Sequence, residues 1–146
     1  MTRDERPDPG PRRLTIRAEL SAIDAARAFL RETLAPFNLY EEEFFKLELA
    51  LVEICVNITR YAYDAGGGPI ALTLWTVPGV CLEIRDSGRA FDPRLVPPPD
   101  LDAIIAAGRR GGLGVYLARS LVDEFTYRRE NGENIITLSH CLNVAN

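Results

Sequence analysis

The sequence predicts one α+β domain, a two-layer α/β sandwich in which about three helices cover one face of a mixed, mostly antiparallel sheet. Three observations predict this class. Five short segments are typical of strands, two longer ones carry apolar residues at helical spacing and a third helix should follow a glycine cluster, and the order of elements is β-α-α-β-β-loop-α-β-β. With 146 residues, 47% hydrophobic and 26% charged, the chain has the composition of a single globular domain.

The first strand should follow a charged, proline-rich opening. Residues 1–12 are predicted to form a flexible tail, and a single domain should occupy residues 13–146. The stretch "RLTIRAEL", which begins at Arg13, alternates apolar and polar side chains. This period of two is typical of a half-buried strand.

Two helices should follow that strand. Ser21 resembles an N-cap, and apolar residues recur at helical spacing over about 22–35 until Pro36 interrupts them. A longer apolar stripe extends from Glu41 to about Tyr63 and ends at "DAGGGP". The sequence therefore predicts two consecutive helices.

The second half should contain two hairpins separated by a long connection. The runs "IALTLWTV" and "VCLEIRD" are separated by Pro78-Gly79, and "EFTYRRE" and "NIITLSHCL" by Asn131-Gly132, which predicts two antiparallel pairs. Residues 87–112 form the connection, and a third helix is expected over about 113–124. A connection of this length in a small domain is typically functional or mobile.

Charge and composition exclude several classes of protein. The 17 Lys+Arg and 21 Asp+Glu give a net charge of -4, which offers no basic surface for nucleic acid or for an anionic membrane. No stretch approaches the roughly 20 apolar residues of a membrane span, and the opening lacks the apolar segment of a signal peptide, so a cytoplasmic protein is expected. Cys55, Cys81 and Cys141 lack metal-ligand spacing and are predicted to be reduced, mostly buried thiols.

The first candidate site lies on the second helix, in "ELALVEICVNITRYAY". Glu53 and Asn57 are four residues apart and so share one side of the helix. One interpretation is a solvated polar face. The other is a Mg²⁺ site, in which Asn57 offers a carbonyl oxygen to the metal and Glu53 orients or deprotonates a nucleophile beside it.

The second candidate site is "RDSGRAFDP", where the third predicted strand ends. Asp86 and Gly88 can form an ordinary turn held by local hydrogen bonds of the aspartate. Alternatively, a carboxylate at a strand end can accept a hydrogen bond from an exocyclic amine such as N6 of adenine. Gly88 would then let the backbone pass close to a flat ring.

The third candidate site is the glycine-rich stretch before the last helix. Gly111, Gly112 and Gly114 fall at the predicted helix start, where backbone amides and the helix dipole can bind phosphate oxygens. Arg109 and Arg110 add positive charge. A flexible loop before a helix is the alternative. The stretch is neither a P-loop nor a dinucleotide-binding motif, because neither pattern is present.

In this order the three motifs resemble the Bergerat ATP-binding fold of gyrase, MutL and sensor histidine kinases. Within that superfamily, residues of about 14–140 are similar to the anti-sigma-factor serine/threonine kinases. "VEICVNITRYAY" resembles their E-A-x-x-N-A-x-x-H-A-Y, and "RDSGRAFDP" resembles their D-x-G-x-G-F-D. "GGLGVYLARSLVDEFTYRRE" resembles their G-x-G-L-x-L-[IV]-x-x-[LM]-x-D-x-[VF]-x-Y, and this is the most specific of the three.

The resemblance implies roles for these residues. Asn57 would bind Mg²⁺, Glu53 would be the base that activates the substrate hydroxyl, and Asp86 would bind adenine N6 of ATP. Gly88 would support the base, and Thr137 would add a hydrogen bond beside it. The glycines, chiefly Gly112 and Gly114, would line the phosphates beneath a lid over about 93–111.

Two positions depart from the family pattern. Tyr61 stands where the family has histidine, which puts in doubt whatever that side chain contributes. Ala90 replaces the second glycine of D-x-G-x-G, which would stiffen the hinge of the lid or alter nucleotide affinity.

The sequence therefore favours an ATP-dependent kinase that phosphorylates a serine or threonine of an anti-sigma-factor antagonist protein and acts as an anti-sigma factor. The family resemblance also suggests a homodimer. The alternative is a catalytically silent module that binds ATP or ADP and switches protein partners. A sensor histidine kinase is disfavoured because the sole histidine, His140, lies in the last strand, where a satisfied, partly buried role is expected.

Overall fold

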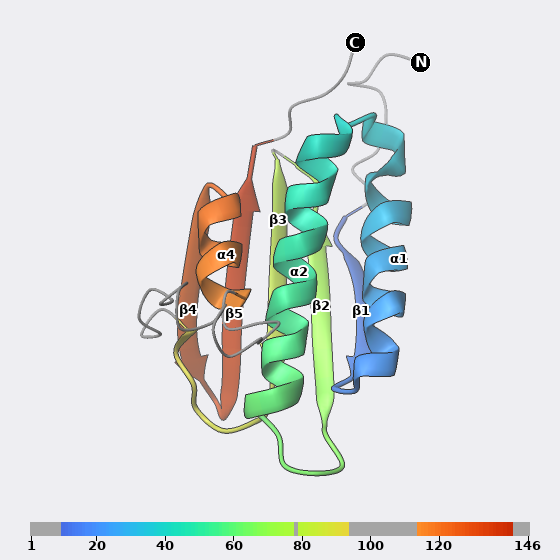
Figure 1. Ribbon diagram of the computed structural model, residues 1–146. Helices are drawn as coiled ribbons and strands as arrows, with labels where there is room; N and C mark the ends of the chain where they lie inside the picture. The colour runs from blue at the N-terminus through green and yellow to red at the C-terminus, as the bar shows by residue number, and fades with distance from the viewer. Residues whose placement is uncertain (1–9, 78, 94–113, 142–146) are drawn as a thin grey trace, which may run out of the picture.

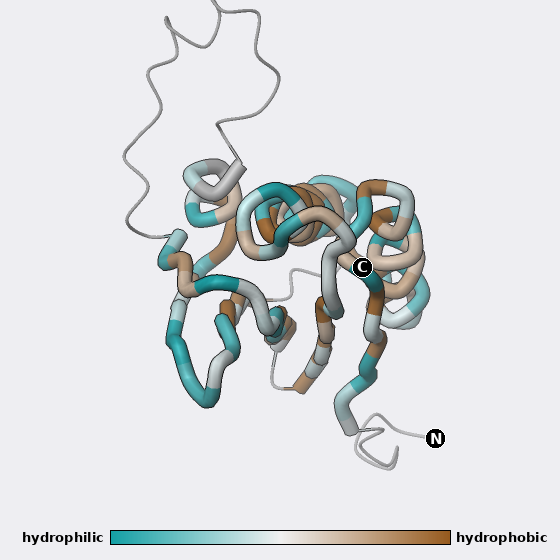
Figure 2. The backbone as a smooth tube through the Cα atoms, turned by 90° about the horizontal axis from the view of Figure 1, so that it is seen from below, coloured by the Kyte–Doolittle hydropathy of each residue, from teal (hydrophilic) through white to brown (hydrophobic). Residues whose placement is uncertain are grey.

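The computed structural model describes residues 10–77, 79–93 and 114–141. In these residues one five-stranded sheet is covered on one face by helices, as Figure 1 shows. The predicted α+β class and order of elements are confirmed. Figure 2, viewed from below, shows the helices on one side of the strands.

The sheet is antiparallel throughout its described strands. Its spatial order is β1-β2-β3-β5-β4, and all four pairings are antiparallel, where the sequence had predicted a partly mixed sheet. Asn131 and Gly132 have φ angles of 51° and 78° and form the tight turn of the last hairpin. The strands are β1 (Arg12–Arg17), β2 (Pro69–Trp75), β3 (Val80–Asp86), β4 (Glu124–Glu130) and β5 (Glu133–His140).

The helices are α1 (Ile23–Leu34), α2 (Glu41–Tyr61) and α4 (Gly114–Leu121). The prediction of Ser21 as an N-cap is wrong. Ser21 lies inside a 3-10 turn, η2 (Leu20–Ala22), and α1 begins after it with no side-chain cap. A second such turn, η3 (Ala35–Phe37), ends α1 at the predicted proline. Helix α4 ends three residues before the predicted 124, because β4 starts at Glu124.

The core lies between α2 and the central strands. Helix α2 crosses the middle of the sheet in Figure 1 and buries seven side chains: Phe44, Leu47, Ala50, Leu51, Ile54, Cys55 and Ile58. In β2 and β3 every second residue is buried, as expected for strands with one covered face. This packing holds the carboxyl-terminal end of α2 beside the end of β3, where two of the candidate motifs meet.

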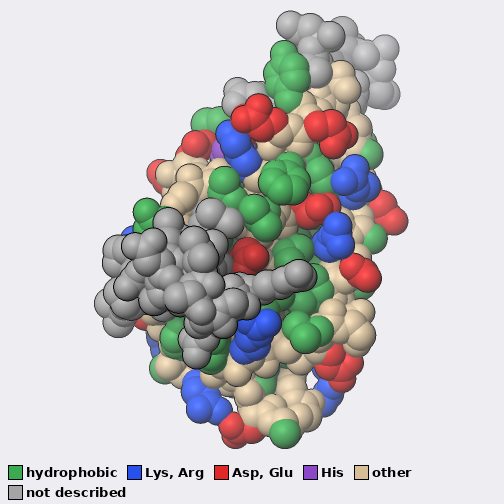
Figure 3. Space-filling view, viewed as in Figure 1, with side chains coloured by type: hydrophobic (Ala, Val, Ile, Leu, Met, Phe, Trp, Pro, Cys, Tyr) green, Lys and Arg blue, Asp and Glu red, His purple; other side chains and the backbone are tan. Residues whose placement is uncertain are grey.

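Several apolar side chains remain exposed on the helix face. Figure 3 shows them among charged side chains on that face. Phe45 and Tyr61 of α2 are 59% and 53% exposed, and Tyr116 of α4 is 44% exposed. None of the described helices is long and apolar enough to cross a membrane.

The three thiols occupy different environments. Cys55 is buried in the core, and burial raises its pKa to about 12. Cys81 is half-buried and Cys141 is exposed. All three are free, but only one of them is fully buried, so the prediction of mostly buried thiols is wrong for Cys141.

Candidate functional site

A pocket opens where α2 lies beside the last residue of β3 and the start of β5. Two residues from separate sequence motifs, Asn57 and Asp86, both line it. The family resemblance implies one site for these two residues, but their local sequence patterns do not show that they line one cavity. The full lining consists of Ile54, Asn57, Ile58, Ala62, Asp86, Phe91, Pro93, Asn134 and Ile136.

Asp86 provides a buried acceptor in this pocket. It alternates with Leu82 and Ile84 on the helix side of β3 and is 2% exposed. Its Oδ1 accepts hydrogen bonds from the Gly88 amide and from Nδ2 of Asn134, both at 2.9 Å. Burial raises the pKa of Asp86, and these two bonds act in the opposite direction. Among the described residues no hydrogen bond is made to Oδ2.

Asn134 is a site residue that the sequence motifs missed. It lies directly opposite Asp86 in the β3–β5 pairing and is 2% exposed. Opposite residues in antiparallel strands share a face, so Asn134 and Asp86 both face the helices. The signal that could have found it is the strand register, which requires the pairing of β3 with β5 across a long connection.

Thr137 lies on the other face of the sheet. It is paired with Glu83, whose side chain points away from the helices. Thr137 therefore does not face the pocket, contrary to the expectation that it would lie beside Asp86. One face of β5 carries Asn134, Ile136 and Leu138, and Thr137 faces the opposite way.

Gly88 is required by a close approach of the chain to α2. A Cβ atom added there would lie 2.2 Å from the carbonyl oxygen of Ala62, at the end of α2. The neighbouring Arg89 amide donates a hydrogen bond to the same oxygen at 2.8 Å. On the other side, Nη1 of Arg129 donates to the Gly88 carbonyl at 2.8 Å. The sequence identified this glycine but not its contact, which is with the protein backbone.

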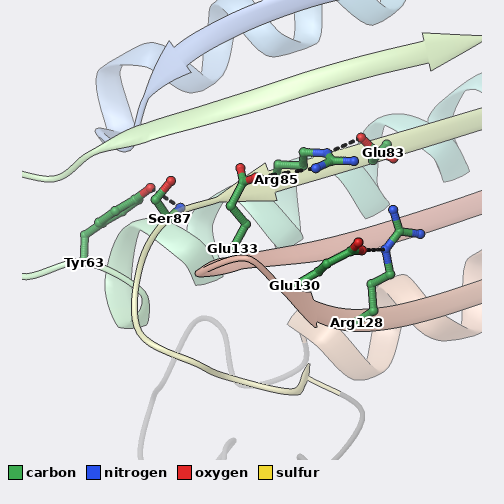
Figure 4. A network of polar contacts seen from close by, with 7 residues as sticks. All are labelled: Tyr63, Glu83, Arg85, Ser87, Arg128, Glu130 and Glu133. Atoms are coloured by element: carbon green, nitrogen blue, oxygen red, sulfur yellow. Dashed lines mark hydrogen bonds and ion pairs between the residues drawn. The ribbon is translucent and has the colours of Figure 1, made fainter.

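Tyr63 joins three chain segments beside the site. Its hydroxyl donates to the carbonyl of Pro69 and accepts from the amide of Ser87, both at 2.7 Å. Figure 4 shows the ring directed toward Ser87. A Cβ atom at Gly68 would lie 2.4 Å from this ring, so only glycine fits there. The tyrosine thus fixes the end of α2 relative to β2 and β3, and burial raises its pKa.

The charged residues on the outer face of the sheet form a separate network. Arg85 pairs with Glu83 of its own strand and with Glu133 of β5, and Arg128 pairs with Glu130 (Figure 4). Arg85 alternates with the buried Ile84, so it points away from the pocket. These exposed or half-exposed pairs stabilise the fold weakly and do not join the site.

Glu53 and Asn57 are both half-buried on α2, one turn apart. Among the described residues neither side chain has a hydrogen-bond or ion-pair partner. Asn57 lines the pocket, and Glu53 lies one turn nearer the start of the helix. No group of three or more His, Cys, Asp or Glu side chains in the described ranges is arranged to hold a metal. A Mg²⁺ ion at Asn57 would therefore complete its coordination with water and ligand oxygens, which is its ordinary habit.

The phosphate-binding part of the predicted site is described only at its edge. Arg109, Arg110, Gly111 and Gly112 lie outside the described residues, as does the predicted lid apart from Pro93. Pro93 is buried and lines the pocket, and Gly114 is the first residue of α4.

The two departures from the family pattern lie beside the pocket. Tyr61 stacks on Phe91 with ring centroids 6.1 Å apart and an interplanar angle of 27°, and Phe91 lines the pocket. Ala90 is exposed and is not among the residues with positive φ, so its backbone accepts a side chain without strain.

Comparison with known proteins identifies the family. Residues 16–140 match the model of the histidine kinase-like ATPase domain. The chain belongs to this family. Among curated relatives, the serine/threonine-protein kinase BtrW of Bordetella bronchiseptica is 35% identical over 97 residues, which are 65% of this chain and 68% of that protein. The serine-protein kinase RsbW of Bacillus thuringiensis is 27% identical over 95 residues, 62% of this chain and 59% of that protein.

A solved structure has the same histidine kinase-like fold. The RsbU and RsbW domains of a Mycobacterium tuberculosis protein match with a TM-score of 0.61 and 24% identity, over 90% of this chain. The chain spans 32% of that protein and 59% of the Bacillus relative, so it matches part of each. These matches confirm the family resemblance drawn from the three motifs, and they confirm the fold.

Proposed function

We propose that this protein is an ATP- and Mg²⁺-dependent serine/threonine kinase of a partner-switching system. It phosphorylates a small antagonist protein and acts as an anti-sigma factor toward a sigma factor or similar regulator. The observation that carries the proposal is the convergence of Asn57 and Asp86 on one pocket. The kinase names of the two curated relatives support the reaction type.

In this proposal the pocket binds the adenine ring. Asp86 accepts a hydrogen bond from the exocyclic amine through Oδ2, while Oδ1 is held by protein donors. Ile54, Ile58 and Ile136 supply the apolar walls. A buried carboxylate is a stronger acceptor than a neutral group, which favours a base with an amine at this position.

The catalytic part of the proposal rests on α2. Asn57 would hold Mg²⁺ through its amide oxygen, and the ion would neutralise charge on the phosphates. Glu53, one turn away and unpaired among the described residues, accepts the proton of the substrate hydroxyl as that oxygen bonds to the γ-phosphorus of ATP. The bond from the γ-phosphorus to the bridging oxygen breaks, and ADP leaves. Gly111, Gly112 and Gly114, with Arg109 and Arg110, would hold the phosphates at the start of α4. A lid over about 93–111 would close over them.

The experiment compares the native protein with Glu53→Gln. Each is incubated with γ-labelled ATP, Mg²⁺ and a protein extract of the source organism, and labelled residues are located by mass spectrometry. The native protein should label serine or threonine of a small protein. Glu53→Gln should bind ATP with native affinity but transfer phosphate about a hundredfold more slowly, because a general base contributes about that factor or more.

Two results would contradict parts of the proposal. Full-rate transfer by Glu53→Gln would show that this glutamate is not the general base, although the protein would still be a kinase. Normal ATP binding with no labelled protein, together with complexes that form only with nucleotide, would show a binding module that switches partners without chemistry.

A further inference from the structure

The side-chain amide of Asn134 makes four hydrogen bonds. Nδ2 donates to Oδ1 of Asp86 at 2.9 Å and to the carbonyl of Arg89 at 2.8 Å. Oδ1 accepts from the hydroxyl of Tyr127 at 2.7 Å and from the amide of Phe91 at 3.3 Å. A primary amide has two donor hydrogens and one oxygen that accepts about two bonds, so this amide has no capacity left.

These partners also fix which way the amide faces. The Phe91 amide can only donate, and the Asp86 carboxylate and Arg89 carbonyl can only accept. Exchanging the oxygen and nitrogen of Asn134 would therefore break three of the four bonds. Because the residue is 2% exposed, water cannot replace those bonds at low cost.

We propose that Asn134 is the positioning residue that sets nucleotide-base selectivity, by holding Asp86 so that its second oxygen alone faces the base. This inference rests on the proposed function, since it concerns the same pocket. The saturated amide itself has nothing to offer a ligand, so it acts through Asp86 and not by touching the base.

Asn134 also holds the wall of the pocket. Its hydrogen bonds to the Arg89 carbonyl and the Phe91 amide fix the loop that follows Gly88, and Phe91 lines the pocket. One side chain thus links the acceptor, the loop that follows it and β4 through Tyr127. A residue that could not supply two donors and two acceptors would leave the carboxylate and this loop free to move.

The test measures affinity for ATP and for inosine triphosphate, which has an oxygen in place of the exocyclic amine. Titrations use the native protein, Asn134→Leu and Asn134→Asp. The native protein should prefer ATP. Asn134→Leu should bind ATP about tenfold more weakly, with most of the preference over inosine triphosphate lost, because an unsatisfied buried polar contact typically costs about that factor.

The pH dependence separates positioning from simple loss of structure. In Asn134→Leu, Asp86 loses a bond that lowers its pKa, so it should take up a proton at higher pH, and ATP affinity should fall as pH falls. In Asn134→Asp, two carboxylates would face each other and share a proton, so ATP affinity should fall as pH rises. Among the residues that the structure describes, the charged or titratable groups that act on Asp86 are Arg129 of β4, Glu133 of β5 and Tyr63 after α2, and they are the same in both variants.

Two further variants complete the test: one is a control, and the other removes a single hydrogen bond of Asn134. Ser139→Ala changes a half-buried residue on the outer face of the same strand and should leave affinity and selectivity unchanged. Tyr127→Phe removes one of the four bonds with little change of shape and should reduce ATP affinity about threefold. It also keeps the inference testable if Asn134→Leu does not fold.

The outcomes distinguish this inference from the proposed function. If the native protein does not bind ATP, or binds both nucleotides equally, the nucleotide pocket itself is wrong. If the native protein prefers ATP and the folded Asn134 variants keep that preference with parallel pH profiles, the positioning role is wrong. Opposite pH trends in the two variants would support it.

Discussion

The two ends of the β3–β5 ladder hold buried polar clusters with different properties. At one end Asp86 is paired with Asn134, and at the other Val80 is paired with His140. Nε2 of His140 contacts Glu43 at 2.6 Å, while Nδ1 is buried without a hydrogen bond and lies 3.7 Å from Asp123. The carboxylate of Asp123 accepts a hydrogen bond from the backbone amide of Cys141 at 2.7 Å, and this bond lowers the pKa of Asp123.

The difference lies in where the unused polar atom faces. At the Asp86 end, the carboxylate oxygen left without a hydrogen bond belongs to a residue that lines a pocket. At the His140 end, the unused ring nitrogen is sealed inside the protein. The comparison favours the Asp86 end as the ligand site, because of the two ends only that one has an acceptor without a hydrogen bond on a residue that lines a pocket. The His140 cluster instead ties the start of α2 to the end of β5.

The largest expected effect is that of Gly88→Ala. The new methyl group would overlap the Ala62 carbonyl, and overpacking of this kind typically costs about 3 kcal/mol of unfolding free energy. Chemical denaturation measures the change. Ala90→Ser, which adds one atom at an exposed position of the same loop, is the matched control and should change stability by less than about 0.5 kcal/mol. Equal stability of Gly88→Ala and the native protein would contradict the tight packing of this loop on α2.

Asp86→Asn tests whether the buried carboxylate binds the nucleotide base. It replaces a charged acceptor with a neutral one and should weaken ATP binding by about 2 kcal/mol, roughly thirtyfold. Titration calorimetry measures this. Undiminished ATP affinity would show that Asp86 does not bind the base.

The same variant should also change how the free energy of unfolding depends on pH. Burial raises the pKa of Asp86 above 3.8, so between 3.8 and the raised value the folded chain keeps a proton that the unfolded chain has released. The stability of the native protein therefore falls as pH rises through that window, and Asp86→Asn lacks this contribution. Denaturation at several pH values should show the variant gaining stability relative to the native protein as pH rises. A constant difference would contradict the burial cost.

His140→Leu should lower the stability of the fold and leave ATP binding unchanged, whereas Asp86→Asn should weaken ATP binding. Losing the contact with Glu43 should lower the unfolding free energy by about 1 to 2 kcal/mol, because Glu43 would remain half-buried. ATP affinity of the folded variant should stay native, because the cluster lies at the other end of the ladder from the pocket. A tenfold loss of ATP binding would erase the distinction between the two ends.

Tyr61→Ala should have the smallest effect. The side chain is 53% exposed, and its stacking on Phe91 contributes about 0.5 kcal/mol. ATP affinity should change by about twofold, measured by the same titration. A loss as large as that of Asp86→Asn would make Tyr61 a part of the binding site and not its border.

The sequence was sufficient where a local pattern decides the structure. Periodicity, β-rich composition and turn residues located the strands and helices of the described residues, and the strand-end position of Asp86 was readable because "VCLEIRD" ends there. It was insufficient where distant segments meet. Asn134 and Thr137 are both polar residues of β5, and only the register of β5 against β3 decides which of them faces the pocket.

Two other residues show the same limit. The glycine pattern identified position 88, but the need for glycine comes from Ala62, at the end of a helix far away in sequence. The expectation of a satisfied His140 is half met, since one ring nitrogen contacts Glu43 and the other has no hydrogen bond. Burial follows from local pattern, whereas the identity of the contact depends on the tertiary fold.

The most direct test is calorimetric titration of ATP, with and without Mg²⁺, into the native protein and Asn57→Ala. The native protein should bind ATP more tightly with Mg²⁺, and the substitution should abolish that gain, because Asn57, which lines the pocket with Asp86, is the proposed Mg²⁺ ligand. Absence of ATP binding by the native protein, or an equal Mg²⁺ effect in Asn57→Ala, would contradict the proposed site.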